Sequence, residues 1–316
     1  MGEKEPAMPP ANCRGYNARL LSAAPRGAPR VMLSYRHAFH AGNYADVLKH
    51  AVLIHSLDYL QQKEKPLRII DTHAGAGLYK LNGIQARKTG EFTAGVGKIW
   101  ELAKAGEPLP AAIAHYLERI GQTNPSGQLT RYPGSPCLVH QQLRPQDRLF
   151  LHELHPTDVQ ILKEHLGQDN RVKIADEDGL AGMLALLPPP ERRGLVLIDP
   201  SYEVKSDYQR VAKQIIQAHK RFATGTYALW YPVVARARID ELEKSLKKSG
   251  IRNIQLYELA VRADGHEQGM TASGMILINP PWTLWQAMEE ALPWLVDHLG
   301  DAATGAGYRL EQLVEE

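Results

Sequence analysis

The segment GLVLIDPSYE, residues 194–203, begins with an unbroken apolar run and then turns to an acid, a proline and an aromatic ring. A run that is apolar at every position, rather than at alternate positions, predicts a strand buried on both faces of a parallel sheet. Six similar runs predict further strands, at about 67–71, 148–153, 171–175, 225–230, 253–261 and 274–279.

Helical patterns separate several of these strands. One covers about 44–63, with Asn43 as its N-cap, and another covers about 207–221. Alternating strands and helices predict an α/β fold with a doubly wound, mostly parallel sheet of seven strands.

The stretch between the first two strands is too long for a simple connection. It contains helical patterns at about 91–105 and 108–121, followed by the Pro/Gly-rich TNPSGQLTRYPGSP. We therefore expect a small helical insertion subdomain at 78–128 within one domain made of residues 32–77 and 129–316.

Residues 1–31 differ from the rest of the chain. They contain five prolines, show no apolar periodicity and lack the apolar core of a secretion signal. We interpret them as a disordered N-terminal extension or as the result of an upstream start codon. A transit peptide is a third interpretation, because part of the segment contains arginine and few acids.

The composition is that of an ordinary globular protein, with 44% hydrophobic and 23% charged residues. No apolar run approaches the roughly 20 residues that span a bilayer, and Cys13 and Cys137 are not spaced as a disulfide framework or a zinc site. We expect a cytoplasmic protein that does not bind membranes.

The net charge is only +2, but residues 191–262 contain 14 Lys/Arg against 8 Asp/Glu, which favours nucleic-acid binding in that half.

Ligands of open α/β sheets bind beyond the carboxyl ends of the strands. Here the ends are DTHAGAG (71–77), ELHP (153–156), DEDG (176–179) and DPSY (199–202). A turn containing Gly75 and Gly77 lets the backbone approach a ligand, Glu153 can accept two ribose hydroxyls, and Asp178 with Gly179 can border an adenine. This pattern suits NAD or S-adenosylmethionine, and the third glycine of the dinucleotide fingerprint is missing.

The DPSY segment favours S-adenosylmethionine and methylation of an exocyclic amine. The amino nitrogen of adenine is a poor nucleophile, because its lone pair is shared with the ring. The Asp199 carboxylate and the carbonyl of Pro200 can accept both N–H bonds and aim a more tetrahedral nitrogen at the methyl group. Tyr202 can stack on the flipped base.

INPPW, residues 278–282, is a second candidate for the same motif. It follows the seventh predicted strand, which we expect to run antiparallel to its neighbours, so its end would lie at the opposite edge from the cofactor. We therefore place the catalytic motif at residues 199–202.

Together these motifs resemble the RlmJ family, bacterial adenine-N6 methyltransferases that act on 23S ribosomal RNA. The resemblance rests on YRHAFHAGNYADVLKH, DTHAGAG, YPGSP, ELHP, LIDPSYE, YALWYPVV and GMTASGMILINPPW, and it extends from Met32 nearly to the C-terminus. It implies a Rossmann-like class I S-adenosylmethionine-dependent methyltransferase that acts on adenine-2030. We expect a monomer. One departure is Ser201, where the family resembles DPPY.

The resemblance also implies roles for particular residues. Asp199 would be catalytic, with Tyr35, His37 and Lys49 at the mouth of the active site. The residues that would border S-adenosylmethionine are His50, His73, Ser135, Glu153, Asp178, Gly179 and Asp199.

Two other classes of protein remain open at this point. HAFH (37–40) and HELH (152–155) suggest a metal-dependent nuclease or phosphoesterase, and the resembling family has been linked to the use of external DNA. We expect no metal, and we interpret His40 and His152 as hydrogen-bonded structural residues. A binding protein without catalysis is the third class, but Asp199 would repel phosphate in a nucleic-acid cleft and needs another reason to be there.

Overall fold

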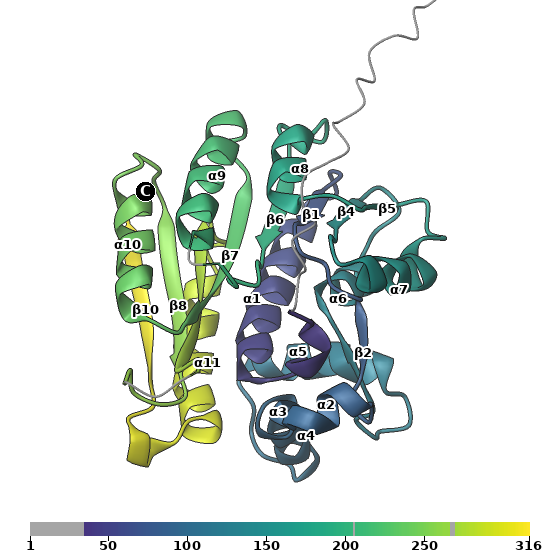
Figure 1. The fold of residues 1–316 in the computed structure, drawn as a ribbon, viewed down its shortest axis with the longest axis vertical. Coiled ribbons are helices and arrows are strands. Elements are labelled where there is room, and N and C mark those ends of the chain that lie inside the picture. Colours follow the sequence, from purple (N-terminus) through teal and green to yellow (C-terminus); the bar gives the residue numbers. More distant parts are fainter. Residues whose placement is uncertain (1–34, 205, 266–268) are drawn as a thin grey trace, which may run out of the picture. The chain divides into compact units, whose positions relative to one another are not determined.

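The predicted strands assemble into one sheet. The computed structural model describes residues 35–316, apart from residue 205 and residues 266–268, and the predicted extension at 1–31 lies outside these residues. Within the described residues the strand order is β10-β8-β9-β7-β6-β1-β4-β5 (Figure 1). The strands are β1 (Arg68–Asp71), β4 (Arg148–His152), β5 (Val172–Ala175), β6 (Gly194–Ile198), β7 (Thr226–Val233), β8 (Ile254–Ala260), β9 (Ala272–Ile278) and β10 (Gly307–Val314).

The sheet is mostly parallel, as expected. β5, β4, β1, β6 and β7 pair with parallel neighbours, and Asp71 at the end of β1 lies opposite Leu151 of β4 and Leu197 of β6. β9 is antiparallel to both β7 and β8, as predicted for the seventh strand. The predicted fold class is confirmed.

The prediction of seven strands missed β10. This strand pairs antiparallel with β8 at the edge of the sheet, and its residues are exposed or only partly buried. Its sequence, GYRLEQLV, mixes polar and apolar residues and lacks the continuous apolar character that marks the buried strands.

Helices cover both faces of the sheet, so the molecule has two apolar cores. On β6, Leu195 and Leu197 belong to one core, while Val196 and Ile198 belong to the other. The first core contains α1 (Tyr44–Gln61), α5 (Ala111–Thr123), α6 (Ser135–Gln141), α7 (Pro156–Leu166) and α11 (Leu284–Leu299). The second contains α8 (Gly179–Leu186), α9 (Asp207–Arg221) and α10 (Arg236–Lys247), which lie side by side in Figure 1.

Helix α1 is largely buried and contains ionisable residues among its buried side chains. Asn43 caps it as predicted, because its side chain accepts a hydrogen bond from the backbone N–H of Asp46. The helix packs against β7, β9, α5, α6 and α11, and it buries Asp46, Lys49 and His50 together with its apolar residues. Three ionisable residues in one buried helix need a purpose beyond packing.

The stretch between β1 and β4 is more varied than predicted. It contains β2 (Leu78–Lys80), α2 (Ile84–Thr89), α3 (Glu91–Ala94), α4 (Val96–Lys104), α5, β3 (Arg131–Pro133) and α6. β2 and β3 form a small antiparallel sheet that was not predicted. The grouping of 78–128 as a separate subdomain stays a prediction.

The helix predicted at 91–105 is broken at Gly95. A Cβ atom at this position would lie 2.3 Å from the carbonyl oxygen of Gly42, to which the N–H of Val96 donates a hydrogen bond of 2.8 Å. The close contact with the segment before α1 therefore ends α3 and starts α4.

No helix in the described part of the chain is both long and apolar enough to cross a membrane.

Candidate active site

Four acidic residues gather along one edge of the sheet. Asp71 ends β1, Glu153 follows β4, Asp178 follows β5, and Asp199 follows β6. These four strands are parallel neighbours, so their carboxyl ends share an edge. The structure thus brings together the strand ends that the sequence singled out.

Asn279 of the rival motif lies at the opposite edge. β9 is antiparallel to β7, and its last residue, Ile278, pairs with Tyr227 near the start of β7. The carbonyl of Asn279 accepts a hydrogen bond of 3.0 Å from the hydroxyl of Thr226. The topological reason for choosing residues 199–202 is therefore confirmed.

Asp199 is held by Lys49 through one carboxylate oxygen. The Nζ atom of Lys49 lies 2.6 Å from Oδ2 of Asp199 and 2.8 Å from Oδ1 of Asp46. The other oxygen of Asp199, Oδ1, makes no hydrogen bond within the described residues, and the side chain is 13% exposed. One oxygen is fixed and the other can accept a hydrogen bond from a ligand.

The charges of this pair follow from burial and from each other. Burial raises the pKa of Asp199, and the ammonium of Lys49 opposes that rise. Burial alone would lower the pKa of Lys49, but the carboxylates of Asp199 and Asp46 raise it above its usual range. Lys49 therefore remains an ammonium ion although only 3% of its surface is exposed.

Asp46 is a site residue that the sequence analysis missed. Its Oδ2 accepts hydrogen bonds from Nε2 of His37 (2.9 Å) and from the backbone N–H of Gly42 (2.8 Å). Burial alone would raise its pKa, but His37 and Lys49 hold the pKa of Asp46 well below its usual range. A signal was present in the sequence: Asp46 lies one turn before Lys49, so the two charges fall on the same face of a helix.

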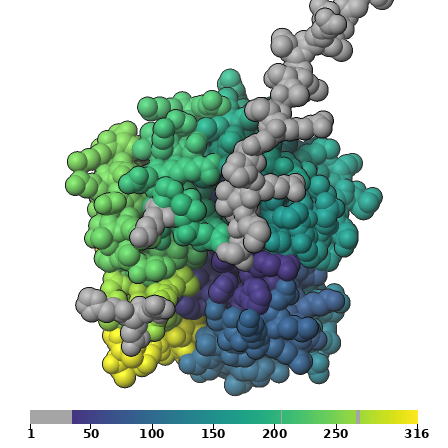
Figure 2. Space-filling view, viewed as in Figure 1, coloured from purple at the N-terminus to yellow at the C-terminus, as the bar shows by residue number. Residues whose placement is uncertain are grey.

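The chain of contacts continues to the surface. Because the carboxylate of Asp46 can only accept, Nε2 of His37 donates to it, and Nδ1 of the same ring lies 2.9 Å from the hydroxyl of Tyr35. The backbone N–H of Tyr35 also donates to Glu203, in the loop after Tyr202. Figure 2 shows the purple start of the described chain at the surface, next to the blue residues between β1 and β4. Tyr35, His37, Lys49 and Asp199 are thus connected through Asp46.

The loop after β6 has an unusual backbone. Tyr202 has a φ of 52°, a left-handed backbone conformation that residues other than glycine rarely adopt. Its hydroxyl donates to the carbonyl of Trp230 at 2.9 Å, and its ring lies 4.3 Å from that of Tyr208. Both contacts hold the Tyr202 ring and with it the Pro200–Ser201 segment.

The glycine-rich turn after β1 is bound to Glu153. Oε2 of Glu153 accepts from the N–H of Gly75 (2.7 Å), and Oε1 accepts from the N–H of His155 (2.6 Å). Gly75 and Gly77 have φ values of 61° and 77°, which favour glycine. Each oxygen of Glu153 keeps a second lone pair, and burial raises the pKa of this carboxyl group.

Asp71 is a second site residue that the sequence analysis did not name among the residues around the cofactor. Its two oxygens accept from the hydroxyl of Ser135 (2.7 Å) and from the N–H of His73 (3.1 Å). Burial raises the pKa of Asp71 to about 6. Burial also lowers the pKa of His73 to about 4, and Nδ1 of that ring contacts the hydroxyl of Thr72 at 2.8 Å. Two predicted cofactor residues, Ser135 and His73, therefore lie around Asp71.

Asp178 and Gly179 shape the start of α8. Oδ1 of Asp178 caps the helix by accepting from the N–H groups of Leu180 and Ala181, and its Oδ2 pairs with Arg210. A Cβ atom at Gly179 would lie 1.8 Å from the carbonyl oxygen of Thr72. Only glycine allows this close approach of α8 to the turn after β1.

His50 carries an unsatisfied nitrogen. Its Nδ1 lies 2.7 Å from the hydroxyl of Tyr132, whereas Nε2 is buried, has no hydrogen-bond partner among the residues described and lies 4.0 Å from Oδ1 of Asp46. Burial lowers the pKa of His50 to about 3, so its ring is neutral. This nitrogen therefore remains available for a hydrogen bond to a ligand or a water molecule.

The remaining histidines of the two His-containing segments give a mixed result. His40 bonds Glu91 at 2.9 Å, as expected of a structural residue. Nδ1 of His152 lies 3.3 Å from Oε1 of Glu177, whereas its Nε2 has no hydrogen-bond partner among the described residues. Its ring packs against Gly182 of α8, and burial lowers its pKa, so it is neutral and acts through packing. In the described ranges, no group of three or more His, Cys, Asp or Glu could hold a metal ion.

Three comparisons with known proteins, by family model, by sequence and by structure, find similar proteins. A family model described as "Ribosomal RNA large subunit methyltransferase D, RlmJ" matches residues 64–314. The chain is 50% identical over 274 residues to ribosomal RNA large subunit methyltransferase J of Escherichia coli (strain K12), covering 87% of this chain and 96% of that protein. It is 50% identical over 276 residues to the Haemophilus influenzae protein of the same name, covering 87% and 97%. A crystal structure of a Legionella pneumophila protein superimposes with a TM-score of 0.79 at 37% identity, covering 86% of this chain and 98% of that one.

Proposed function

This chain belongs to the RlmJ family of ribosomal RNA large subunit methyltransferases, and we propose that it transfers a methyl group from S-adenosylmethionine to the exocyclic N6 of an adenine in 23S rRNA, adenine-2030. The observation that carries the proposal is Asp199. It follows a central parallel strand, one oxygen is held by a buried ammonium, and the other is open to a ligand.

The residues of this loop can activate an adenine amino group. Oδ1 of Asp199 accepts one N–H of the target base, and the carbonyl of Pro200 accepts the other. These bonds make the nitrogen more tetrahedral and turn its lone pair toward the methyl group. Lys49 keeps Asp199 ionised and in place, so the base meets a prepared anion rather than a mobile side chain.

The proton balance also favours Asp199. As the new N–C bond forms, N6 must lose one proton, and Oδ1 of Asp199 is the acceptor in contact with it. Burial raises the pKa of Asp199, which makes it a better base than an exposed carboxylate. We further propose that the rings of Tyr202 and Tyr35 stack on the flipped base.

The residues at the neighbouring strand ends suit S-adenosylmethionine, which supplies an electrophilic methyl group on its sulfonium. Glu153 retains a lone pair on each oxygen for two ribose hydroxyls, and Gly75 and Gly77 keep side chains out of the turn. Asp178 and Gly179 would border the adenine ring. The unpaired nitrogen of His50 gives the pocket one further polar contact.

Ser135 and His73 would act mainly through Asp71, which both of them bond. All of these residues come from one chain, so we propose that a monomer suffices. We further propose that the protein works in the cytoplasm, on rRNA, without a membrane and without a metal ion.

The decisive experiment follows labelled methyl groups. The protein and methyl-labelled S-adenosylmethionine are incubated with 23S rRNA from a strain that lacks this modification, and digested nucleosides are separated. We expect the label in N6-methyladenosine, with one methyl group transferred per rRNA molecule. Label in another nucleoside would contradict the proposed target atom, and transfer that a chelator abolishes would contradict the metal-free mechanism.

A further inference from the structure

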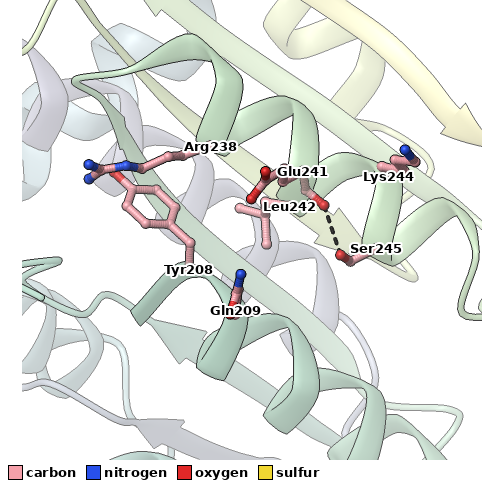
Figure 3. A pocket seen from close by; sticks show the side chains of 7 residues that line it. All are labelled: Tyr208, Gln209, Arg238, Glu241, Leu242, Lys244 and Ser245. Atoms are coloured by element: carbon pink, nitrogen blue, oxygen red, sulfur yellow. Dashed lines mark hydrogen bonds between the residues drawn. The ribbon is translucent and has the colours of Figure 1, made fainter. Parts of the chain in front are cut away.

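A groove outside the strand-end site is lined by two cations, Arg238 and Lys244, that have no ion-pair partner among the described residues. It lies between α9 and α10, has a volume of about 240 Å³ and is lined by residues that include Tyr208, Arg238, Glu241 and Lys244 (Figure 3). Arg238 and Lys244 lie at opposite ends of the row of α10 side chains. This is the region in which the sequence concentrates Lys and Arg.

Arg238 is oriented but not neutralised. Its guanidinium lies 5.8 Å from the ring centroid of Tyr208, a cation–π contact, and it forms no ion pair or hydrogen bond in the described part of the chain. Arg236, two residues earlier, is saturated by contrast, since it bonds both Glu258 and Asp264. The donors of Arg238 are thus free for a ligand, and a planar fork of this kind matches a phosphate group.

The groove connects directly to the catalytic loop. The hydroxyl of Tyr208 donates to the carbonyl of Pro232 at the end of β7, and its ring lies 4.3 Å from that of Tyr202. A phosphate bound at Arg238 would therefore lie two ring contacts away from the loop that presents Asp199. An enzyme that flips a base has to hold the strand on either side of it.

We propose that the α9–α10 groove binds the phosphate backbone next to the target nucleotide, with Arg238 as the phosphate fork and Lys244 as a second attractive charge. This inference rests on the proposed function, because it takes rRNA as the substrate. Glu241 limits the affinity, since its carboxylate lines the same groove and repels phosphate.

The test is the salt dependence of RNA binding. A single-stranded fragment of 23S rRNA that contains the target adenine is titrated with the full chain at several salt concentrations. Arg238→Ala should weaken binding about tenfold at low salt and lower the slope of log K against log salt by about 0.7. Arg238→Lys should keep the slope and lose part of the affinity, and Glu241→Gln should tighten binding.

Lys213→Ala is the matched control, because Lys213 is an exposed cation on α9 that does not line the groove. It should change affinity by less than about twofold. The groove inference would be overturned if Arg238→Ala and Lys213→Ala had equal effects, or if Arg238→Ala left the slope unchanged. Methyl transfer by the wild-type protein would in that case still support the proposed function. Failure of the wild-type protein to methylate rRNA would instead overturn the proposed function.

Discussion

At the scale of single residues, the site depends on one buried ammonium between two carboxylates. Lys49 fixes one oxygen of Asp199 and is itself fixed by Asp46. A buried charge is tolerated only where partners compensate it, so the loss of one of the three side chains destabilises the charges of the other two.

Removing Asp199 should abolish catalysis without unfolding the protein. Asp199→Ala should lower the single-turnover rate of methyl transfer by about 10³-fold or more, because the acceptor that acts on the amino group is gone. The fold should persist, since Lys49 keeps Asp46 as a partner. RNA binding should stay the same or tighten slightly, because an anion leaves the cleft.

Ser201→Pro is the companion variant. It restores the family's Pro-Pro pair and stiffens the loop, so the rate should be maintained or rise. Substantial transfer by Asp199→Ala would remove that residue from the mechanism, and loss of transfer in Ser201→Pro would give the serine a role of its own.

Asp46 should act as a positioning residue. Asp46→Asn keeps the shape but removes the charge that holds Lys49 and His37, and we expect turnover to fall about 10²-fold with little change in S-adenosylmethionine affinity. The carboxylate raises the pKa of Lys49, so without it the alkaline limb of the pH–rate profile should move to lower pH. Asp58→Asn, in the same helix but paired with His115, is the control. An unmoved alkaline limb in Asp46→Asn would leave Asp46 with a purely structural role.

At the scale of elements, much of the fold follows from sequence patterns. The continuous apolar runs predicted seven strands, and the pattern at 207–221 predicted α9 to the residue. The cap at Asn43 was also readable, because it is a local interaction. Features that depend on distant partners were not. Gly95 breaks a helix only because Gly42 lies against it, and β10 is a strand only because β8 offers it an edge.

The same distinction holds for the site. The acids at the strand ends were predictable from topology alone. Asp46 was missed because its role depends on where α1 lies relative to β6, which no local pattern records.

The turn after β9 should matter for stability and not for catalysis. Asn279 has a φ of 51°, and its amide donates to the carbonyls of Ala223 and Gly225 at 2.8 Å each. Asn279→Ala should cost about 2–3 kcal/mol of unfolding free energy, from the lost hydrogen bonds and the left-handed backbone. Denaturant unfolding measures this cost, and turnover per folded molecule should stay near normal.

Asn279→Gly separates the two contributions, because glycine tolerates the backbone but lacks the amide. A collapse of turnover at an unchanged melting temperature would show instead that INPPW is the catalytic motif.

At the scale of the whole molecule, stability should depend on the ionisation of Asp71 in the middle of the sheet. Burial raises its folded-state pKa from 3.8 to about 6. Between these values the folded protein binds a proton that the unfolded chain has lost, so this contribution to stability is full below pH 3.8 and is lost as the pH rises through about 6. The loss amounts to about 3 kcal/mol.

Asp71→Asn is the matched variant, since its side chain does not titrate. The unfolding free energy of the wild type relative to this variant should therefore fall between pH 4 and pH 7. A constant difference across that range would mean that Asp71 has an ordinary pKa in the folded protein.

The place of β9 in the sheet has a consequence for the nascent chain. β9 fills the gap between β7 and β8 and packs on α1, although α1 ends at Gln61 and β9 begins at Ala272. On the ribosome, α1 and the strands up to β8 therefore emerge before their central partner exists, and the apolar edge of β7 stays unpaired until translation has passed Ile278. Such a high contact order makes folding slow and late. Until then the unpaired edge of β7 is prone to aggregation and is a binding site for chaperones. The contact between α1, which carries Lys49, and β9 can therefore form only after residues 272–278 have been synthesised.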